Sequence, residues 1–462
     1  MRFKGDLGKD EIGGLLLALS LPAMIGMTVQ ALYNVVDTFW VGKLGPEAIA
    51  ALSICFPIQM LMIAVATGTG IGLTSIISRR LGENLDSEAV NAAEHGIMLV
   101  LFYGVLVTIL GLIYAGPLLH TFGATPELFD SSKDYIKIIL LGSILMFFGI
   151  LSGSIIQAEG NAGTPMKSML SGAITNIILD PFLIFGIGPF PEMGIQGAAI
   201  ATLIGQLAAC SINFRYIFGR QGQLILSLRN FKLSFYILGE IYKVGLPSMV
   251  MQLVNSLIIV VLNRILGSYG YLAIGALGVF FRVQSLIFMP VIGLTHGLTP
   301  IVGFAYGARR LDRMKEAIKK ASLVSFIIMS IGFLAFQLIP GQVVAAFNND
   351  PLLIELGKEC MRNISILMPF VGPSIIMISS FQAAGKGFTA LWLSLLRQLV
   401  FLLPAIFILS SILDLRGVWL AFPASDFLAI SITALILKKY LNDLERNGFP
   451  QRNNISDTQG IL

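Results

Sequence analysis

The chain has 462 residues, of which 55% are hydrophobic and 12% are charged, and its mean hydropathy is +0.83. A soluble domain carries about 25% charged residues, so this composition excludes a soluble globular protein. Apolar stretches near 20 residues recur along the chain, which predicts an all-α polytopic membrane protein. The net charge of +5 arises from basic residues in loops and does not indicate a nucleic-acid partner.

Twelve apolar segments are long enough to cross a bilayer, and short loops separate them. Turn sequences such as Gly45-Pro46-Glu47 mark the hairpins between neighbouring spans. The twelve expected transmembrane helices cover residues 13–41, 49–77, 91–115, 135–157, 165–188, 195–219, 236–264, 271–303, 317–340, 361–384, 388–413 and 416–438.

Basic residues predict the orientation, because Lys and Arg concentrate in cytoplasmic loops. Of the 31 Lys and Arg residues, 22 lie on the side of the two termini, 7 lie in the opposite loops, and Arg282 and Arg397 lie inside apolar spans. We therefore expect a multi-pass plasma-membrane protein with cytoplasmic N- and C-termini. The seven residues of the opposite loops are Lys43, Lys133, Lys137, Arg264, Lys358, Arg362 and Arg416.

An internal repeat divides the chain into two halves of the same topology. One shift of 225 residues holds from the first span to the end of the fourth, and span 6 needs a shift of 220. Because the shift covers six spans, the halves are parallel repeats, which predicts two pseudo-symmetric six-helix lobes. Residues 1–222 and 223–445 would form the lobes, and residues 446–462 a polar cytoplasmic tail. The matched positions include Leu21-Pro22 with Leu246-Pro247, Gln59 with Gln284, Gly72-Leu73-Thr74 with Gly297-Leu298-Thr299, and Gly197 with Gly417.

Polar side chains share one helical face in the first span. They recur at spacings of 3, 4 and 7 residues, and one of them is a carboxylate. A carboxylate at membrane depth costs roughly 2.5–3.5 kcal/mol, so we expect this face to line a cavity or meet a partner. The alternative is that Asp37 lies at the membrane surface and caps the helix end. Pro22 removes one backbone hydrogen bond and can bend or break this helix. The polar residues are Gln30, Tyr33, Asn34 and Asp37.

The fifth span carries a second candidate, because Asn176 and Asp180 are four residues apart and point to one face. Pro181 follows directly and should distort the helix, and the alternative is that Asp180 caps a short helix. The repeat places Asp37 opposite Leu262 and Asp180 opposite Ala405, so the carboxylates are not part of the duplicated scaffold. Carboxylate, amide and hydroxyl oxygens suit a proton or Na⁺.

Other intramembrane polar residues give weaker indications. Asn255, Arg282 and Gln284 are candidates for a substrate path, whereas Arg397 could face lipid and snorkel. Glu159 should be solvated at the end of span 4. The sequence has no G-x-x-x-x-G-K-S/T loop, no nucleophile constellation and no Cys-based metal pattern, so we expect neither an enzyme nor a bound cofactor.

These motifs, in this order and at these spacings, resemble the multidrug and toxic compound extrusion (MATE) transporters over nearly the whole chain. The resemblance is to the prokaryotic branch that carries its carboxylates in the N-terminal lobe. The matching segments are Leu21-Pro22, Tyr33-Asn34-x-x-Asp37, Gly45-Pro46-Glu47, Arg79-Arg80-x-Gly82, Gln157-Ala158-Glu159-Gly160, Asn176-x-x-x-Asp180-Pro181, Gly197-Ala198-Ala199-x-Ala201-Thr202 and Ala305-Tyr306-Gly307.

The resemblance implies two lobes in a V around a central cavity and a secondary active multidrug exporter. Amphiphilic or cationic compounds would leave by antiport against H⁺ or Na⁺, with the protein working as a monomer in the bilayer. The coupling site would be Asp37, Asn176, Asp180 and Thr202, with Tyr135 nearby. A second branch of the family uses acidic residues of the second half, and spans 7, 8 and 10 hold none in their apolar interiors here.

Two other functions remain open at the level of sequence. A lipid-linked oligosaccharide flippase of the same wider superfamily would need a strongly cationic cavity, and the arginines inside the apolar spans are sparse, essentially Arg282 and Arg397. An ion channel would show uncoupled flux.

The charge distribution gives the first testable prediction. Single cysteines at positions 230 and 445 should resist an impermeant thiol reagent added to intact cells and react once the cells are permeabilised, because both positions are expected in the cytoplasm. Ready labelling of both from outside would reverse the topology.

Overall fold

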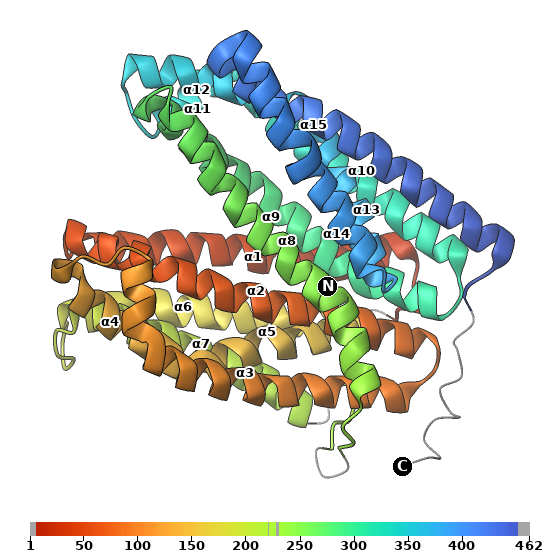
Figure 1. The fold of residues 1–462 in the computed structure, drawn as a ribbon. Helices are drawn as coiled ribbons and strands as arrows, with labels where there is room; N and C mark the ends of the chain where they lie inside the picture. The colour runs from red at the N-terminus through yellow and green to blue at the C-terminus, as the bar shows by residue number, and fades with distance from the viewer. Residues whose placement is uncertain (1–5, 220, 228–230, 451–462) are drawn as a thin grey trace.

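The computed structural model describes residues 6–219, 221–227 and 231–450, and all regular elements within these ranges are helices (Figure 1). The first half contains α1 (Ile12–Gly42), α2 (Pro46–Gly82), α3 (Asp86–Thr121), α4 (Pro126–Leu141), α5 (Ser143–Ala158), α6 (Gly163–Phe185) and α7 (Gly194–Phe218). The second half contains α8 (Phe235–Gly267), α9 (Tyr271–Gly307), α10 (Leu311–Leu338), α11 (Pro340–Ala345), α12 (Pro351–Ile364), η2 (Ser365–Leu367), α13 (Met368–Ala383), α14 (Gly387–Leu395), η3 (Leu396–Leu402) and α15 (Leu403–Asn447).

The number of spans agrees with the sequence once two irregular helices are considered. Within the described ranges, ten helices are long and apolar enough to cross a membrane, and α4 with α5 forms an eleventh span bent by 47°. One of the ten covers 61 residues, Gly387–Asn447, whereas a bilayer core is only about 30 Å thick. The backbone of Asp414 is not helical (φ 50°, ψ −138°), and the chain turns back at the top of Figure 1. Dividing the helix there gives twelve spans, which confirms the predicted fold class.

Pro22 does not break its helix, which was one of the two outcomes expected for it, and the distortion expected at Pro181 does not end the sixth helix. α1 continues through Pro22 to Gly42, and α6 continues through Pro181 to Phe185. Gly186, in the left-handed conformation, follows the end of α6. A bending role for Pro22 therefore stays a prediction.

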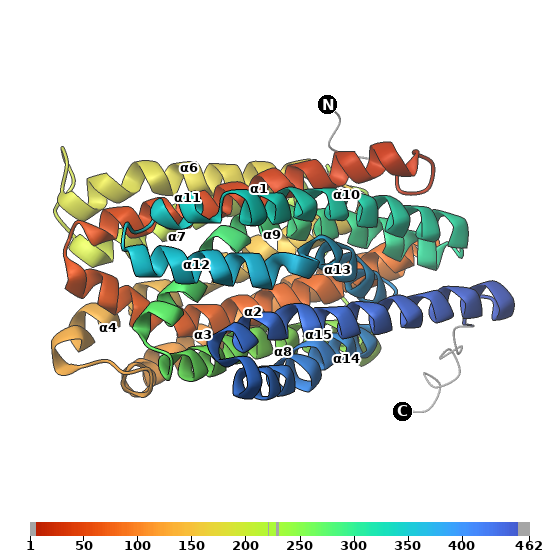
Figure 2. The same cartoon turned by 90° about the horizontal axis from the view of Figure 1, so that it is seen from above.

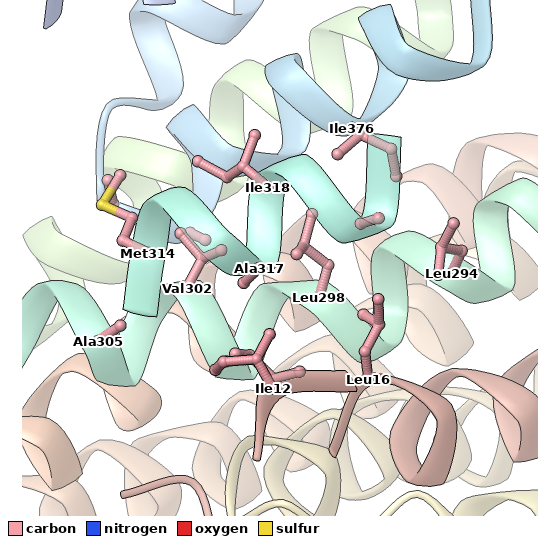
Figure 3. Close-up of a cluster of buried hydrophobic side chains, with 14 of the residues drawn as sticks. Ile12, Leu16, Leu294, Leu298, Val302, Ala305, Met314, Ala317, Ile318 and Ile376 are labelled. Carbon is pink, nitrogen blue, oxygen red and sulfur yellow. The ribbon is translucent and has the colours of Figure 1, made fainter. Parts of the chain in front are cut away.

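The helices form two groups that meet at one end and diverge toward the other (Figure 1). Seen from above, the helices of both groups run along the same long axis (Figure 2). At the end where they meet, the beginning of α1 packs into the second half. Figure 3 shows Ile12 and Leu16 of α1 against Leu294, Leu298 and Val302 of α9, and all five side chains are buried. The first helix of the chain therefore starts inside the opposite lobe.

The beginning of α8 makes the reciprocal contact. Its residues Ile237 and Ile241 are buried in a cluster with Leu73 and Ile76 of α2 and Ile155 of α5. The other two buried clusters each stay within one half, one spanning residues 41–199 and the other residues 258–421. The lobes thus share their cores at one end only.

Glycines let the backbones touch across this shared end. A Cβ on Gly72 of α2 would lie 2.3 Å from the carbonyl oxygen of Ile241, and a Cβ on Gly307 would lie 2.0 Å from that of Arg79. Polar contacts also connect the two lobes at this end. Arg79 pairs with Glu240 of α8 at 3.2 Å, and the Ser75 hydroxyl donates to the carbonyl oxygen of Gln382 at 2.7 Å. This end of the molecule is sealed.

The segment between the halves is attached to the first lobe. Glu159 is 3% exposed and accepts hydrogen bonds from the Gln223 amide and the Tyr216 hydroxyl, so the expectation that it is solvated is wrong. Burial of this carboxylate is possible because it satisfies the backbone of the linker. The boundaries at residues 222/223 and 445/446 stay predictions, and residues 451–462 of the expected tail lie outside the described ranges.

Backbone contact at the sealed end predicts opposite effects for two alanine substitutions. Gly72→Ala should destabilise the protein by about 1–3 kcal/mol, because the added methyl group overlaps backbone that cannot move aside cheaply. Gly239→Ala, in α8 with open space around it, should be neutral or slightly stabilising. Thermal unfolding in detergent measures the stability of both variants. An unchanged melting temperature for Gly72→Ala would show that the contact between α2 and α8 is loosely packed.

Candidate cation site in the first lobe

Three helices of the first lobe, α1, α6 and α7, bring the sequence-predicted oxygen ligands together. α6 and α7 touch through glycines, because a Cβ on Gly205 would lie 2.7 Å from the carbonyl oxygen of Gly172. One helical turn further along α6, Asn176 therefore lies directly against α7. This close approach allows short polar side chains of the two helices to reach each other.

A hydrogen-bonded group of three side chains forms the centre of the site. The Asn176 amide nitrogen lies 3.1 Å from Asp180 Oδ1 and 3.3 Å from Thr202 Oγ1, and it donates to both. Asp180 is fully buried and Asn176 is 2% exposed. The Asn176 amide therefore connects its i+4 neighbour on α6 with a hydroxyl on α7.

Asp37 approaches this group from α1. It lies close enough to Asp180 for the two carboxyl groups to interact electrostatically, and Tyr33 interacts with both and with the Thr202 hydroxyl. Neither aspartate forms an ion pair with a basic residue of the described ranges. The two carboxylates therefore form an acidic site without a resident positive charge.

Three oxygens of the site are buried and have no hydrogen-bond partner among the described residues. They are Asp37 Oδ1, Asn176 Oδ1 and Asp180 Oδ2. A buried acceptor without a donor costs about 1–3 kcal/mol, more for a charged group, so a proton, a cation or a water bound at these atoms would lower the free energy of the site. Carboxylate, amide and hydroxyl oxygens are ligands for a hard cation, and either carboxylate can also take a proton.

Tyr135 extends the site toward α4. The side-chain amide of Gln59 donates to its hydroxyl at 3.3 Å, and the ring is 5% exposed and close to Asp37. Sequence reasoning used Gln59 only as a marker of the repeat and missed it here. Its amide in the middle of an apolar span was the available signal.

The remaining candidates do not join this group. Among the described residues, no hydrogen bond or ion pair connects Gln30 or Asn34 with the carboxylates, and Asn34 is exposed. In the second lobe, Asn255 accepts a hydrogen bond from Gln398, and Arg282 is exposed. Of the four polar residues predicted on this face of α1, only Tyr33 and Asp37 therefore reach the site.

The second lobe holds a charge pair that sequence reasoning missed. Arg397 Nε lies 2.6 Å from Asp426 Oδ1, so the prediction that Arg397 faces lipid and snorkels is wrong. A buried carboxylate on α15 binds the guanidinium within the lobe, which costs less than exposing it to hydrocarbon. The feature of the sequence that could have revealed this pair was Asp426, a carboxylate within the twelfth apolar span. A small cavity of about 20 Å³ adjoins the pair, and Gln284 also lines it.

Comparison with known proteins places this arrangement among transporters. A relative in Shewanella oneidensis named "FAD transporter" is 27% identical over 428 residues, which cover 93% of this chain and 95% of the relative. The multidrug export protein MepA of Staphylococcus aureus is 25% identical over 430 residues, covering 93% and 94%.

Solved structures match over almost the full length. An outward-facing multidrug resistance MATE family transporter of the MOP superfamily is 30% identical, with a TM-score of 0.89 and coverage of 96% of this chain and 98% of that one. A MOP superfamily transporter from Pyrococcus furiosus, described as having a binding pocket of reverse polarity, matches equally well. The family model described as MatE matches residues 22–182 and 247–408, once in each half. The chain therefore belongs to the MatE family of transporters.

Proposed function

We propose that this protein is a secondary active multidrug exporter that exchanges amphiphilic organic cations for H⁺ or Na⁺. The observation that carries the proposal is the set of three buried, unpartnered oxygens on Asp37, Asn176 and Asp180. A site that is acidic, buried and without a basic partner gains most from an incoming cation. The names of the Staphylococcus aureus relative and of the matched MATE structure support export of drugs.

The coupling ion would be held by the first lobe alone. Asp37 and Asp180 would supply the charge, while Asn176 and Thr202 would supply neutral oxygens and fix the carboxylate positions. A proton would neutralise one carboxylate, and Na⁺ would need several of these oxygens at once. Either ion removes the repulsion between two nearby carboxylates and so favours closer packing of α1 on α6 and α7.

α1 can transmit that change between the lobes. Its beginning is buried in the second lobe at Ile12 and Leu16, and Asp37 near its end belongs to the first-lobe site. Ion binding that shifts the end of α1 would therefore act, through one continuous helix, on the end of the molecule where the two lobes meet. Release of the drug and reopening at the opposite end would follow as a population shift between two packings.

A second substrate class is favoured by one observation in the other lobe. Arg397 makes a single hydrogen bond to Asp426, and its two terminal nitrogens have no acceptor among the described residues. Such donors suit an oxyanion, and the Shewanella oneidensis relative is named for a substrate with a pyrophosphate group. Export of anionic flavin nucleotides is therefore the second candidate function.

The coupling role of Asp37 gives a direct prediction for transport. Asp37→Asn keeps the size of the side chain but removes its charge, so ethidium uptake into inside-out proteoliposomes driven by an imposed H⁺ or Na⁺ gradient should fall to background. The fold should persist, because neutralising a buried carboxylate relieves a desolvation cost. Asp180→Asn should behave alike, and the double variant should be little worse than either, since residues of one unit are non-additive.

The matched control is Asp130→Asn, which neutralises an exposed aspartate of α4 that forms no hydrogen bond or ion pair with this group among the described residues, and it should transport like the unchanged protein. Comparison at equal reconstituted amounts, with separate ΔpH and Na⁺ arms, also identifies the coupling ion. Normal gradient-driven uptake by Asp37→Asn would remove the carboxylate from coupling.

A further inference from the structure

The charge pair of the second lobe lies at mid-membrane depth. Arg397 follows the start of α14 at Gly387 by ten residues, and Asp426 follows the reversal at Asp414 by twelve, which is about 15–18 Å along either helix. Both positions are therefore near the centre of a core about 30 Å thick. Ionisable residues at that depth are costly and are usually retained for function.

The pair is not inherited from the duplicated scaffold. The shift of 225 residues places Arg397 on Gly172, and the shift of 220 places Asp426 on Gln206. In the first lobe, Gly172 serves the tight contact of α6 with α7, where no side chain fits. The second lobe has instead introduced two opposite charges at this position, so helix packing alone does not account for them.

The backbone around Arg397 is also irregular. Residues Leu396–Leu402 form a π-helix between α14 and α15. A π-turn holds one more residue than an α-turn, and such segments are frequent at functional sites. Arg397, which binds Asp426 and lines the cavity, lies within this segment.

Among the described residues, the Arg397 guanidinium donates a hydrogen bond through only one of its three nitrogens. Its Nε binds Asp426, the arginine side chain is 31% exposed, and that of Asp426 is 7% exposed. No acceptor among the described residues meets the terminal nitrogens, which can bind two oxygens of one carboxylate or phosphate. The adjoining cavity of about 20 Å³ has room for one oxygen-sized group. Gln284 supplies an amide there, and the rest of the lining is mainly aromatic and aliphatic: Phe280, Phe288, Phe422, Ile364, Met368 and Val371.

We propose that Arg397 is an oxyanion-binding subsite of the transport path, which Asp426 occupies until a phosphate or carboxylate group of a substrate displaces it. The proposal rests on the second substrate class above and names the residue that would recognise it. Asp426 presents the same carboxylate chemistry as the ligand and keeps the guanidinium compensated in the empty state.

The test compares two ligands that differ by one phosphate, flavin mononucleotide and riboflavin. Binding to purified protein in phosphatidylcholine nanodiscs is followed by flavin fluorescence anisotropy, with no ion gradient. The unchanged protein should prefer flavin mononucleotide. Asp426→Asn should increase that preference about tenfold, because the competing carboxylate is gone, and a pair with a purely structural role would not tighten binding. Arg397→Gln should abolish the preference while riboflavin affinity stays unchanged.

Arg397→Lys keeps the charge and loses the planar fork, so a reduced preference is expected. Arg264→Gln removes an exposed guanidinium near the end of α8 and serves as the matched control that should change nothing. Equal affinity for both flavins in the unchanged protein and in Asp426→Asn, or no binding of either, overturns the proposal. Loss of the preference when phosphatidylglycerol is added, but not inorganic phosphate, would assign the subsite to a lipid headgroup and also overturn it. Because no ion gradient is applied, the binding result can be interpreted even if the protein does not export substrates by coupled transport.

Discussion

The exchange of first helices between the lobes is the constraint on which the rest of the structure depends. α1 begins in the core of the second lobe and α8 begins in the core of the first. Backbone contact at Gly72, which lies against Ile241 of α8, and at Gly297 of α9, which lies against Ser20 of α1, makes both insertions possible, because a larger residue would hold the lobes apart. The lobes are therefore fixed to each other at one end and have separate cores at the other.

This geometry gives one helix two functions. Near its start, α1 is packed by apolar side chains that are 4% exposed or less at Ile12 and Leu16. Near its end, it carries Asp37 into a polar site made by α6 and α7. Oδ1 of this half-buried carboxylate has no hydrogen-bond partner among the described residues, so in the proposed mechanism its occupancy would bias how the whole helix packs. In the proposed exchange, ion binding would therefore be coupled to lobe closure through one continuous helix.

Features that depend on local periodicity could be predicted from sequence, and those that depend on contacts between distant segments could not. The i, i+4 pair Asn176 and Asp180 and the twelve spans follow from helical spacing and apolar length. The partnership of Arg397 with Asp426 joins two spans through a π-helix, which has no spacing rule to reveal it. Glu159 is a similar case, since the linker that buries it lies more than sixty residues away in sequence.

The two lobes solve the problem of buried charge in opposite ways. The first lobe leaves Asp37 and Asp180 without a basic partner, so the site gains free energy only when a mobile cation arrives. The second lobe balances Asp426 with Arg397, so the site is neutral without any bound ion. A single duplicated scaffold thus presents an acidic site on one side and a guanidinium on the other. Under the proposed functions, the coupling cation and the charged group of an anionic substrate would bind in different lobes, so the two would not compete directly.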